Sequence, residues 1–207
     1  MLKKKSVDAK KRHHLADFHP AKGSVIKVEP IRKKKDVDTI KKMLENHTRN
    51  YCLFVLGINW GLRASDLLSL TVEDVRYTLI GESFEIKERK TNKKRRLTMN
   101  KQTYHAIYNL LKSRRYEDDE LLFQGQRGKM TVQYLNYLVK QWTSSIHLKG
   151  QYGSHTLRKT FGYFKRVYHH VDIPTLMEIF GHSTQKQTLD YLCIQDEEVR
   201  DVYMNGI

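Results

Sequence analysis

Apolar residues recur at helical spacing along most of this chain, and this repeat constrains its fold more than any other feature. Val37, Ile40 and Leu44 form the first such stripe, in a helix that is expected to start near Asp36 or Asp38 as its N-cap. The later helices are expected over 49–60, 64–70, 101–113, 131–146, 155–170, 173–180, 184–192 and 195–204.

The period changes in one early stretch, where apolar and polar residues alternate as in strands. Tight turns divide this stretch at Gly81 and again at 90–94. Strands are expected at 76–80, 83–88 and 95–99. The predicted fold class is therefore mostly α with a small three-stranded antiparallel β-sheet (α+β).

The charge balance indicates a polyanionic partner. The chain carries 38 Lys and Arg against 23 Asp and Glu, a formal net charge of +15. Such an excess is typical of proteins that bind nucleic acid or an anionic membrane surface. The longest apolar run, residues 51–62, is too short to span a bilayer and contains Gly and Asn, so no membrane partner is expected.

Much of this positive charge lies in residues 1–35, which hold 12 Lys and Arg against 3 acidic residues. Apolar periodicity is nearly absent before Val25. We therefore expect a flexible basic N-terminal arm over 1–35 and a folded domain over 36–207. Such an arm can follow DNA phosphates, although a solubilising tail has the same composition.

Cysteine usage indicates a reducing compartment. The two cysteines, Cys52 and Cys193, form no CxxC pair, and Cys52 lies in an apolar run that is typical of a core. The N-terminus lacks the apolar stretch of a secretion signal. We expect a cytoplasmic protein with no metal site and no cofactor.

Two stretches place arginine where an anion would satisfy it. "GLRASDLLSL" puts Arg63 at the start of an apolar helix, where its charge needs a phosphate or a structural ion pair with Asp66. "HTLRKTFGYF" puts His155 and Arg158 on one face near a helix N-terminus, which favours anions. The alternative for this second pair is a capping histidine and a surface cation.

Two further stretches carry other polar groups. "ERKTNKKRR" (88–96) is a basic β-turn, either a solvated hairpin tip or a hairpin that brings a lysine to DNA. "GHSTQKQTLDYL" places Tyr191 nine residues after His182. By itself Tyr191 could equally be a core or interface aromatic.

The order of these motifs is more specific than any one of them. GLRxSD, KTxKxR on a hairpin, HTLR, GHS and a following tyrosine resemble the tyrosine recombinases, also called the phage integrase family, over residues 36–195. The resemblance implies the recombinase catalytic-domain fold. It also implies site-specific DNA recombination through a 3′-phosphotyrosyl intermediate, without metal or ATP. The alternatives are a type IB topoisomerase with the same chemistry and a DNA-binding relative without catalysis.

The resemblance also assigns roles to single residues. Tyr191 corresponds to the nucleophile, and Asp66 corresponds to an acidic residue that supports the first arginine. Lys90 corresponds to the general acid, with Lys93 as the alternative because hairpin register is uncertain. The remaining catalytic positions are Arg63, His155, Arg158 and His182. Basic residues expected to bind DNA are Lys87, Arg89, Lys93, Lys94, Arg95 and Lys159.

The resemblance further implies partners. These are double-stranded DNA, other protomers that assemble as a tetramer on paired sites, and accessory DNA-bending proteins, with nucleoid association when DNA is bound. The chain is similar in size to compact recombinases such as the fimbrial-switch invertases, or it is a fragment without a core-binding domain. The acidic and then apolar segment 195–207 either packs on its own domain or docks on a neighbour. The target sequence, and integration as against inversion or resolution, stay open.

Overall fold

A computed structural model describes residues 27–125, 128–194, 200 and 203–204 of the 207-residue chain. The helices are α1 Lys34–Leu44, α2 Thr48–Trp60, α3 Ala64–Leu67, α4 Val72–Arg76, α5 Lys101–Lys112, α6 Val132–Ser145, α7 Thr156–Val167, α8 Ile173–Phe180 and α9 Gln185–Leu192. The strands are β1 Ser83–Lys87, β2 Lys94–Thr98, β3 Gln124–Gly125 and β4 Gly128–Lys129. The helices expected before residue 195 are present, and the ends of those after α1 are shifted by at most three residues. The N-cap expected at Asp36 or Asp38 is wrong, because α1 begins at Lys34 with Lys33 as its N-cap.

Polar caps determine where the last two helices begin. The Asp172 carboxylate accepts a hydrogen bond from the Thr175 amide at 2.8 Å and starts α8. The Thr184 hydroxyl accepts one from the Gln187 amide at 3.2 Å and starts α9. These caps satisfy amides that lack partners inside the helix, and they set the short loop 181–184 between the two helices.

The early sheet is smaller than expected. Strands β1 and β2 pair antiparallel, but the strand expected at 76–80 is wrong, because α4 ends at Arg76 and turns follow it. A reciprocal capping box between Thr71 and Asp74 starts α4, and Val72 is fully buried. Local capping and burial therefore override the strand-like composition. The two-residue pairing of β3 with β4 was not predicted from the sequence.

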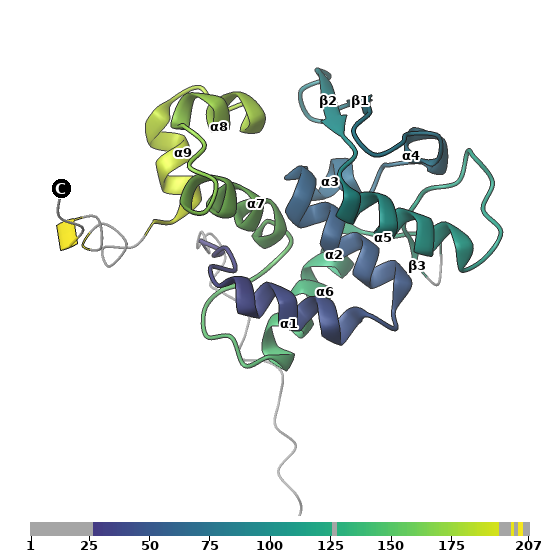
Figure 1. Ribbon diagram of the computed structural model, residues 1–207, viewed down its shortest axis with the longest axis horizontal. Helices are drawn as coiled ribbons and strands as arrows, with labels where there is room; N and C mark the ends of the chain where they lie inside the picture. The colour runs from purple at the N-terminus through teal and green to yellow at the C-terminus, as the bar shows by residue number, and fades with distance from the viewer. Residues whose placement is uncertain (1–26, 126–127, 195–199, 201–202, 205–207) are drawn as a thin grey trace, which may run out of the picture.

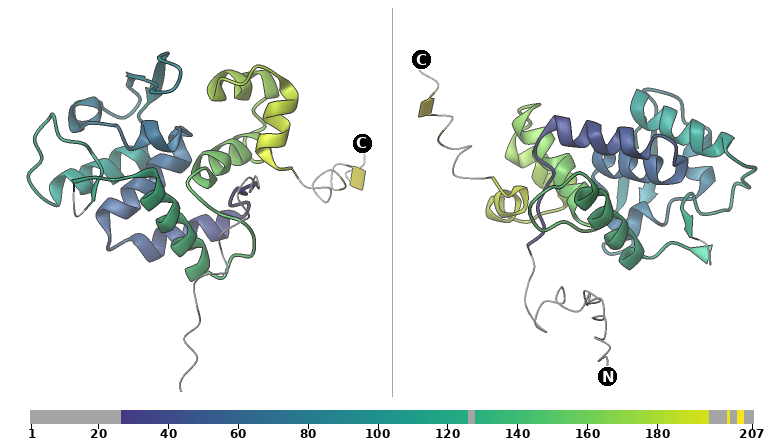
Figure 2. Two further views of the ribbon diagram at one scale, coloured as in Figure 1. Left: turned by 180° about the vertical axis from the view of Figure 1, so that it is seen from behind. Right: turned by 90° about the horizontal axis from the view of Figure 1, so that it is seen from below.

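The main core surrounds α2, which contacts α1, α5 and α7. Residues 52–56 of α2 are all buried, and Cys52 is fully buried, as its apolar surroundings predict. A second, smaller core joins α7, α8 and α9 through Phe161, Leu176, Phe180 and Leu192. The β1–β2 hairpin and the α8–α9 pair both lie along the upper edge of the molecule in Figure 1 and in the reverse view of Figure 2.

Part of the expected N-terminal arm packs on the domain. Helix α1 begins at Lys34, and before it Ile31 is only 1% exposed. The remainder of the arm, residues 1–26, and most of the helix expected over 195–204 lie outside the described residues. Both stay predictions. No helix within the described ranges is long and apolar enough to cross a membrane.

Candidate active site

The corner between α2 and α3 presents Arg63. Gly61 ends α2 in the left-handed region with φ of 55°, and a Cβ there would lie 2.4 Å from Cδ1 of Phe161. Only glycine meets both conditions at this position. Arg63 then occupies the N-cap position of α3 with an extended backbone. Its side chain makes no capping hydrogen bond and is free to contact other segments.

Glu88 is the main partner of Arg63. The Arg63 Nη1 atom lies 2.6 Å from Glu88 Oε2 and 3.9 Å from Asp66 Oδ2, so the expected Arg63–Asp66 pair is secondary. Glu88 is 8% exposed and also accepts a hydrogen bond from the Thr91 hydroxyl at 2.7 Å. Burial alone would raise the pKa of Glu88, but the hydrogen bonds and cations around it bring that pKa below its usual value.

Sequence reasoning missed Glu88. It is the one acidic residue between Lys87 and Arg96, and an isolated carboxylate within a basic run is the signal that could have found it. The supporting residue Asp66 acts on the same hairpin by another route. It is 1% exposed, and its Oδ1 atom accepts a hydrogen bond from the Arg89 amide at 2.9 Å. Asp66 thus connects α3 to the start of the hairpin turn.

The second arginine meets the first at a backbone carbonyl. Arg158, on α7, is 3% exposed, and burial lowers its pKa to about 10, so it stays charged at neutral pH. Its Nη1 and Nη2 atoms donate to the carbonyl oxygens of Gly61 at 2.6 Å and Phe180 at 2.8 Å. Arg63 Nη2 lies 3.5 Å from the same Phe180 oxygen. The guanidinium groups of both arginines therefore converge on the Phe180 carbonyl oxygen. No pattern in the sequence predicts this convergence.

His182 and Tyr191 are in contact across the α8–α9 loop. Gly181 ends α8 in the left-handed region with φ of 63°, and the chain turns directly into His182. The His182 Nδ1 atom lies 3.0 Å from the Thr188 hydroxyl, and its ring centre lies 5.1 Å from that of Tyr191. Partial burial and the charges of the two arginines lower the pKa of His182, which favours the neutral ring.

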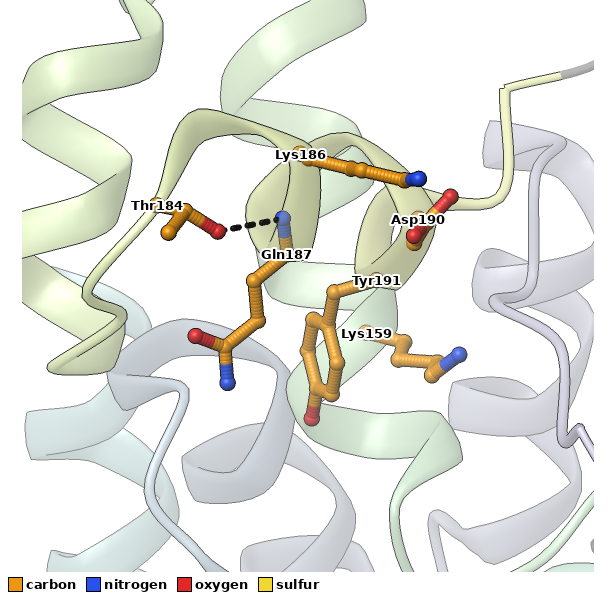
Figure 3. A pocket seen from close by; sticks show the side chains of 6 residues that line it. All are labelled: Lys159, Thr184, Lys186, Gln187, Asp190 and Tyr191. Carbon is orange, nitrogen blue, oxygen red and sulfur yellow. Dashed lines mark hydrogen bonds between the residues drawn. The ribbon is translucent and has the colours of Figure 1, made fainter.

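The Tyr191 hydroxyl is buried and forms no hydrogen bond of normal geometry with a described residue. Burial raises the pKa of Tyr191, whereas the positive charges of Arg158 and Arg63 oppose that rise. The ring lies between Phe180, at 5.2 Å, and the Lys159 ammonium, at 4.8 Å. Its other edge borders an open pocket of about 410 Å³, whose further lining residues are Thr184, Lys186, Gln187 and Asp190 (Figure 3).

His155 and Lys90 lie on the exposed side of the same site. His155 caps α7 and is exposed, as is Lys90 on the hairpin turn. Desolvation lowers the pKa of His155, and the nearby positive charges of Arg158, Lys159, Arg63 and Lys90 lower it further.

The residues expected to bind DNA divide into two groups. Lys87, Arg89, Lys93 and Lys94 are exposed on the hairpin. Arg95 and Lys159 instead form hydrogen bonds within the protein, and their assignment to DNA binding stays a prediction. Arg95 donates to the Trp60 carbonyl oxygen at 2.7 Å, and Lys159, 6% exposed, donates to Cys193 Sγ at 3.1 Å. Within the described residues, no three His, Cys, Asp or Glu side chains are grouped as a metal ion would need.

Comparison with known proteins shows which proteins the chain is similar to. The model of the phage integrase family matches residues 2–198. The chain is 33% identical over 180 residues to the probable integrase/recombinase YoeC of Bacillus subtilis (strain 168), covering 85% of this chain and 95% of YoeC. It is 34% identical over 161 residues to the tyrosine recombinase XerC of Caldanaerobacter subterraneus, covering 74% of this chain but 43% of XerC.

Solved structures share the fold. The crystal structure of XerA recombinase superposes with a TM-score of 0.70 at 18% identity, over 86% of this chain and 63% of that one. XerH site-specific recombinase in its post-cleavage complex superposes with a TM-score of 0.67 at 19% identity, over 86% of this chain and 53% of XerH. The chain thus spans about half to two-thirds of these longer recombinases, and the shared part is mostly helical with small antiparallel sheets.

Proposed function

We propose a DNA strand-transfer mechanism for this chain, which belongs to the phage integrase family of tyrosine recombinases. The observation that carries the proposal is the convergence of Arg63 and Arg158 on one oxygen, the Phe180 carbonyl, beside the contact between His182 and Tyr191. A scissile phosphate bound there takes over hydrogen bonds that the Phe180 oxygen accepts in the absence of DNA. The family favours a recombinase over a topoisomerase or a non-catalytic relative.

The chemistry begins with the phenol of Tyr191. A free tyrosine has a pKa of about 10, and burial raises the pKa of Tyr191, so its proton needs an acceptor. His155 is suited to this step, because its lowered pKa keeps the ring neutral at pH 7. The Tyr191 oxygen then forms a bond to phosphorus, and the bond from phosphorus to the 5′-oxygen breaks. The product is a 3′-phosphotyrosyl link.

The remaining residues stabilise the charges in this step. Arg63 and Arg158 offset the charge of the five-coordinate transition state and of the developing phenolate. His182 donates to a non-bridging oxygen of the phosphate. Lys90 protonates the departing 5′-oxygen, with Lys93 on the same exposed hairpin turn as the alternative donor. A 5′-hydroxyl from another strand reverses the reaction and completes the exchange.

Recombination joins two DNA sites, and each duplex is cut on both strands. We therefore propose that four protomers assemble on paired double-stranded sites, with accessory DNA-bending proteins where the sites are distant. The biological outcome is integration and excision, or inversion, of a mobile or switchable element. The similarity to the probable integrase/recombinase YoeC supports this outcome, because the match covers 95% of the length of YoeC.

Replacing the nucleophile tests the proposal. Tyr191→Phe should abolish the covalent protein–DNA complex on nicked suicide duplexes prepared from the DNA around the gene, while gel-shift affinity stays unchanged. Tyr137→Phe is the matched control, because Tyr137 lies on α6 with 54% of its surface exposed. Mass spectrometry of the trapped peptide should place the nucleotide on Tyr191. Covalent product from Tyr191→Phe would rule out this nucleophile.

A further inference from the structure

Arg32 binds the end of the helix that carries Tyr191. Its Nη2 atom donates to the Cys193 carbonyl oxygen at 3.0 Å, and Cys193 is the C-cap of α9. Its Nη1 atom lies 2.7 Å from the Glu29 carboxylate, which orients the guanidinium. A cation at a helix C-terminus satisfies carbonyl groups that have no partner inside the helix and complements the helix dipole.

The backbone at Cys193 needs such support. Cys193 adopts the left-handed region with φ of 54° and ψ of 43°, which is unfavourable for a residue with a side chain and persists where surrounding contacts enforce it. Here Arg32 holds its carbonyl oxygen, and the Lys159 ammonium donates to its thiol at 3.1 Å. Helix α9 has 8 residues and is too short to be stable alone, so the placement of Tyr191 depends on the packing of α9 against α7 and α8 and on these end contacts.

The segment that carries Arg32 is itself anchored. Residues 28–33 form the N-terminal strap, which Figure 2 shows passing beside the end of α9. The Ile31 amide donates to the Thr160 hydroxyl on α7 at 2.9 Å. The Glu29 amide donates to the Gln151 carbonyl oxygen, four residues before His155, at 2.7 Å. The strap therefore connects the end of α9 to α7, which carries Arg158, and to the segment before His155.

We infer that the N-terminal strap latches α9 in cis, with Arg32 as the positioning residue that keeps Tyr191 in the active site of its own protomer. Rupture of the Arg32–Cys193 contact frees the last turn of α9, and Tyr191 then becomes available to a neighbouring site on the same DNA. The inference rests on the proposed function, because it takes Tyr191 as the nucleophile.

A complementation assay tests the latch. One protomer carries Arg63→Gln, so its site is inactive but its tyrosine is intact. The other carries Tyr191→Phe, so its site is intact but lacks the nucleophile. A covalent complex on a nicked suicide duplex then requires Tyr191 to act in trans. Adding Arg32→Ala to the first protomer should raise this trans product about tenfold, since a hydrogen bond from a charged group is of that strength.

The same substitution in an otherwise unchanged chain should lower cis cleavage. Arg32→Lys should restore it in part, because lysine can reach one acceptor but lacks the fork that also binds Glu29. Arg115→Ala is the matched control, since the Arg115 side chain is 90% exposed on the loop after α5. If Arg32→Ala unfolds the chain, Glu29→Gln weakens the same latch and should shift cleavage in the same direction.

Three results would separate the possible failures. If Arg32→Ala reduces cis cleavage and leaves the trans product unchanged, Arg32 only stabilises the fold and the latch is excluded. An unchanged yield in both assays excludes it as well. If the Tyr191→Phe protein alone forms covalent complex, the proposed nucleophile is wrong and the failure lies in the proposed function.

Discussion

At the residue scale, the carboxylates of Glu88 and Asp66 offset the charges of Arg63 and Arg95 before any DNA is bound. Glu88 lies between Arg63 and Arg95, at 2.6 and 3.4 Å, and Asp66 lies 3.9 Å from Arg63. Buried charges are tolerated when they are paired with an opposite charge or hydrogen-bonded, as these groups are. Arg63 is thus held in place by Glu88, and a phosphate has to compete for the same guanidinium.

Glu88→Gln should lower the free energy of unfolding at pH 7 by about 1–3 kcal/mol, because hydrogen bonds from charged donors are lost. The pKa of Glu88 in the folded protein is below its usual value, so its contribution is present above the unfolded-state pKa of about 4.3 and is lost as pH falls through the folded-state pKa. Urea unfolding should show that the free energies of unfolding of the unchanged protein and of Glu88→Gln differ at pH 7 and approach each other at lower pH.

Glu85→Gln is the control for this substitution. Glu85 pairs with Lys94 at 3.0 Å, but both side chains are more than half exposed, so the expected loss is below about 1 kcal/mol. A loss for Glu88→Gln that stays the same at both pH values would show that its carboxylate charge is not responsible.

His155 gives a direct measure of which lysine faces the site. Its pKa should lie below 6.5, and Lys90→Ala should raise it, since removing a nearby positive charge favours the protonated ring. Lys93→Ala should leave it unchanged. The measurement is an NMR titration of the ring proton, assigned with His155→Gln. A shift with Lys93→Ala and none with Lys90→Ala would exchange the two roles.

At the element scale, short corners between helices determine where the functional side chains point. Arg63 leaves the α2–α3 corner at Gly61, and His182 leaves the α8–α9 corner at Gly181. The elements around each corner are packed, since Phe161 fills the space beside Gly61 and also contacts Phe180. A small shift of the backbone at either corner therefore moves a proposed catalytic side chain.

Gly61→Ala should destabilise the fold by at least about 2 kcal/mol. The left-handed backbone costs about 1–2 kcal/mol for alanine, and the added Cβ overlaps the Phe161 ring. Gly81→Ala is the matched control, because Gly81 also has a positive φ but has no atom within 4 Å of its Cβ position. Thermal unfolding should give a larger loss for Gly61. Equal losses would mean that Phe161 moves without cost.

At the scale of the whole molecule, charge sets the attraction to DNA. The chain has a net charge of +15, and residues 1–23 contribute 7 Lys and Arg. The exposed hairpin adds Lys87, Arg89, Lys93 and Lys94 close to the proposed catalytic residues. Contacts between these cations and phosphates release counterions, so affinity depends on salt.

Deletion of residues 1–23 should weaken DNA binding and flatten its salt dependence. Each lost phosphate contact reduces the magnitude of the negative slope of log K against log salt by about 0.9, so loss of the arm can reduce that magnitude by up to about 6. Fluorescence anisotropy at several salt concentrations measures it. A full-length variant with those 7 lysines and arginines changed to glutamine should behave like the deletion. An unchanged slope would identify the arm as a tail without DNA contacts.

The sequence by itself determined the helices and the principal charged residues. Helical periodicity depends on neighbours three and four positions apart, and caps such as Asp172 and Thr184 are local. The order of the motifs along the chain named Arg63, Arg158, His182 and Tyr191 as one set, and the structure brings them together, while their catalytic roles stay predictions. The strand expected at 76–80 is wrong, although a local signal was present in the sequence. That signal is the capping box between Thr71 and Asp74, which starts a helix that extends to Arg76.

Only the tertiary structure decided which polar groups are buried and what they contact. Glu88, the Phe180 carbonyl oxygen and Arg32 come from segments far apart in the chain, and their partners depend on how those segments pack. Lys159 carries the same charge as the exposed hairpin lysines, yet it is buried against Cys193 and Tyr191. Burial and pairing are set by long-range packing, whereas a residue type reveals only its charge and size.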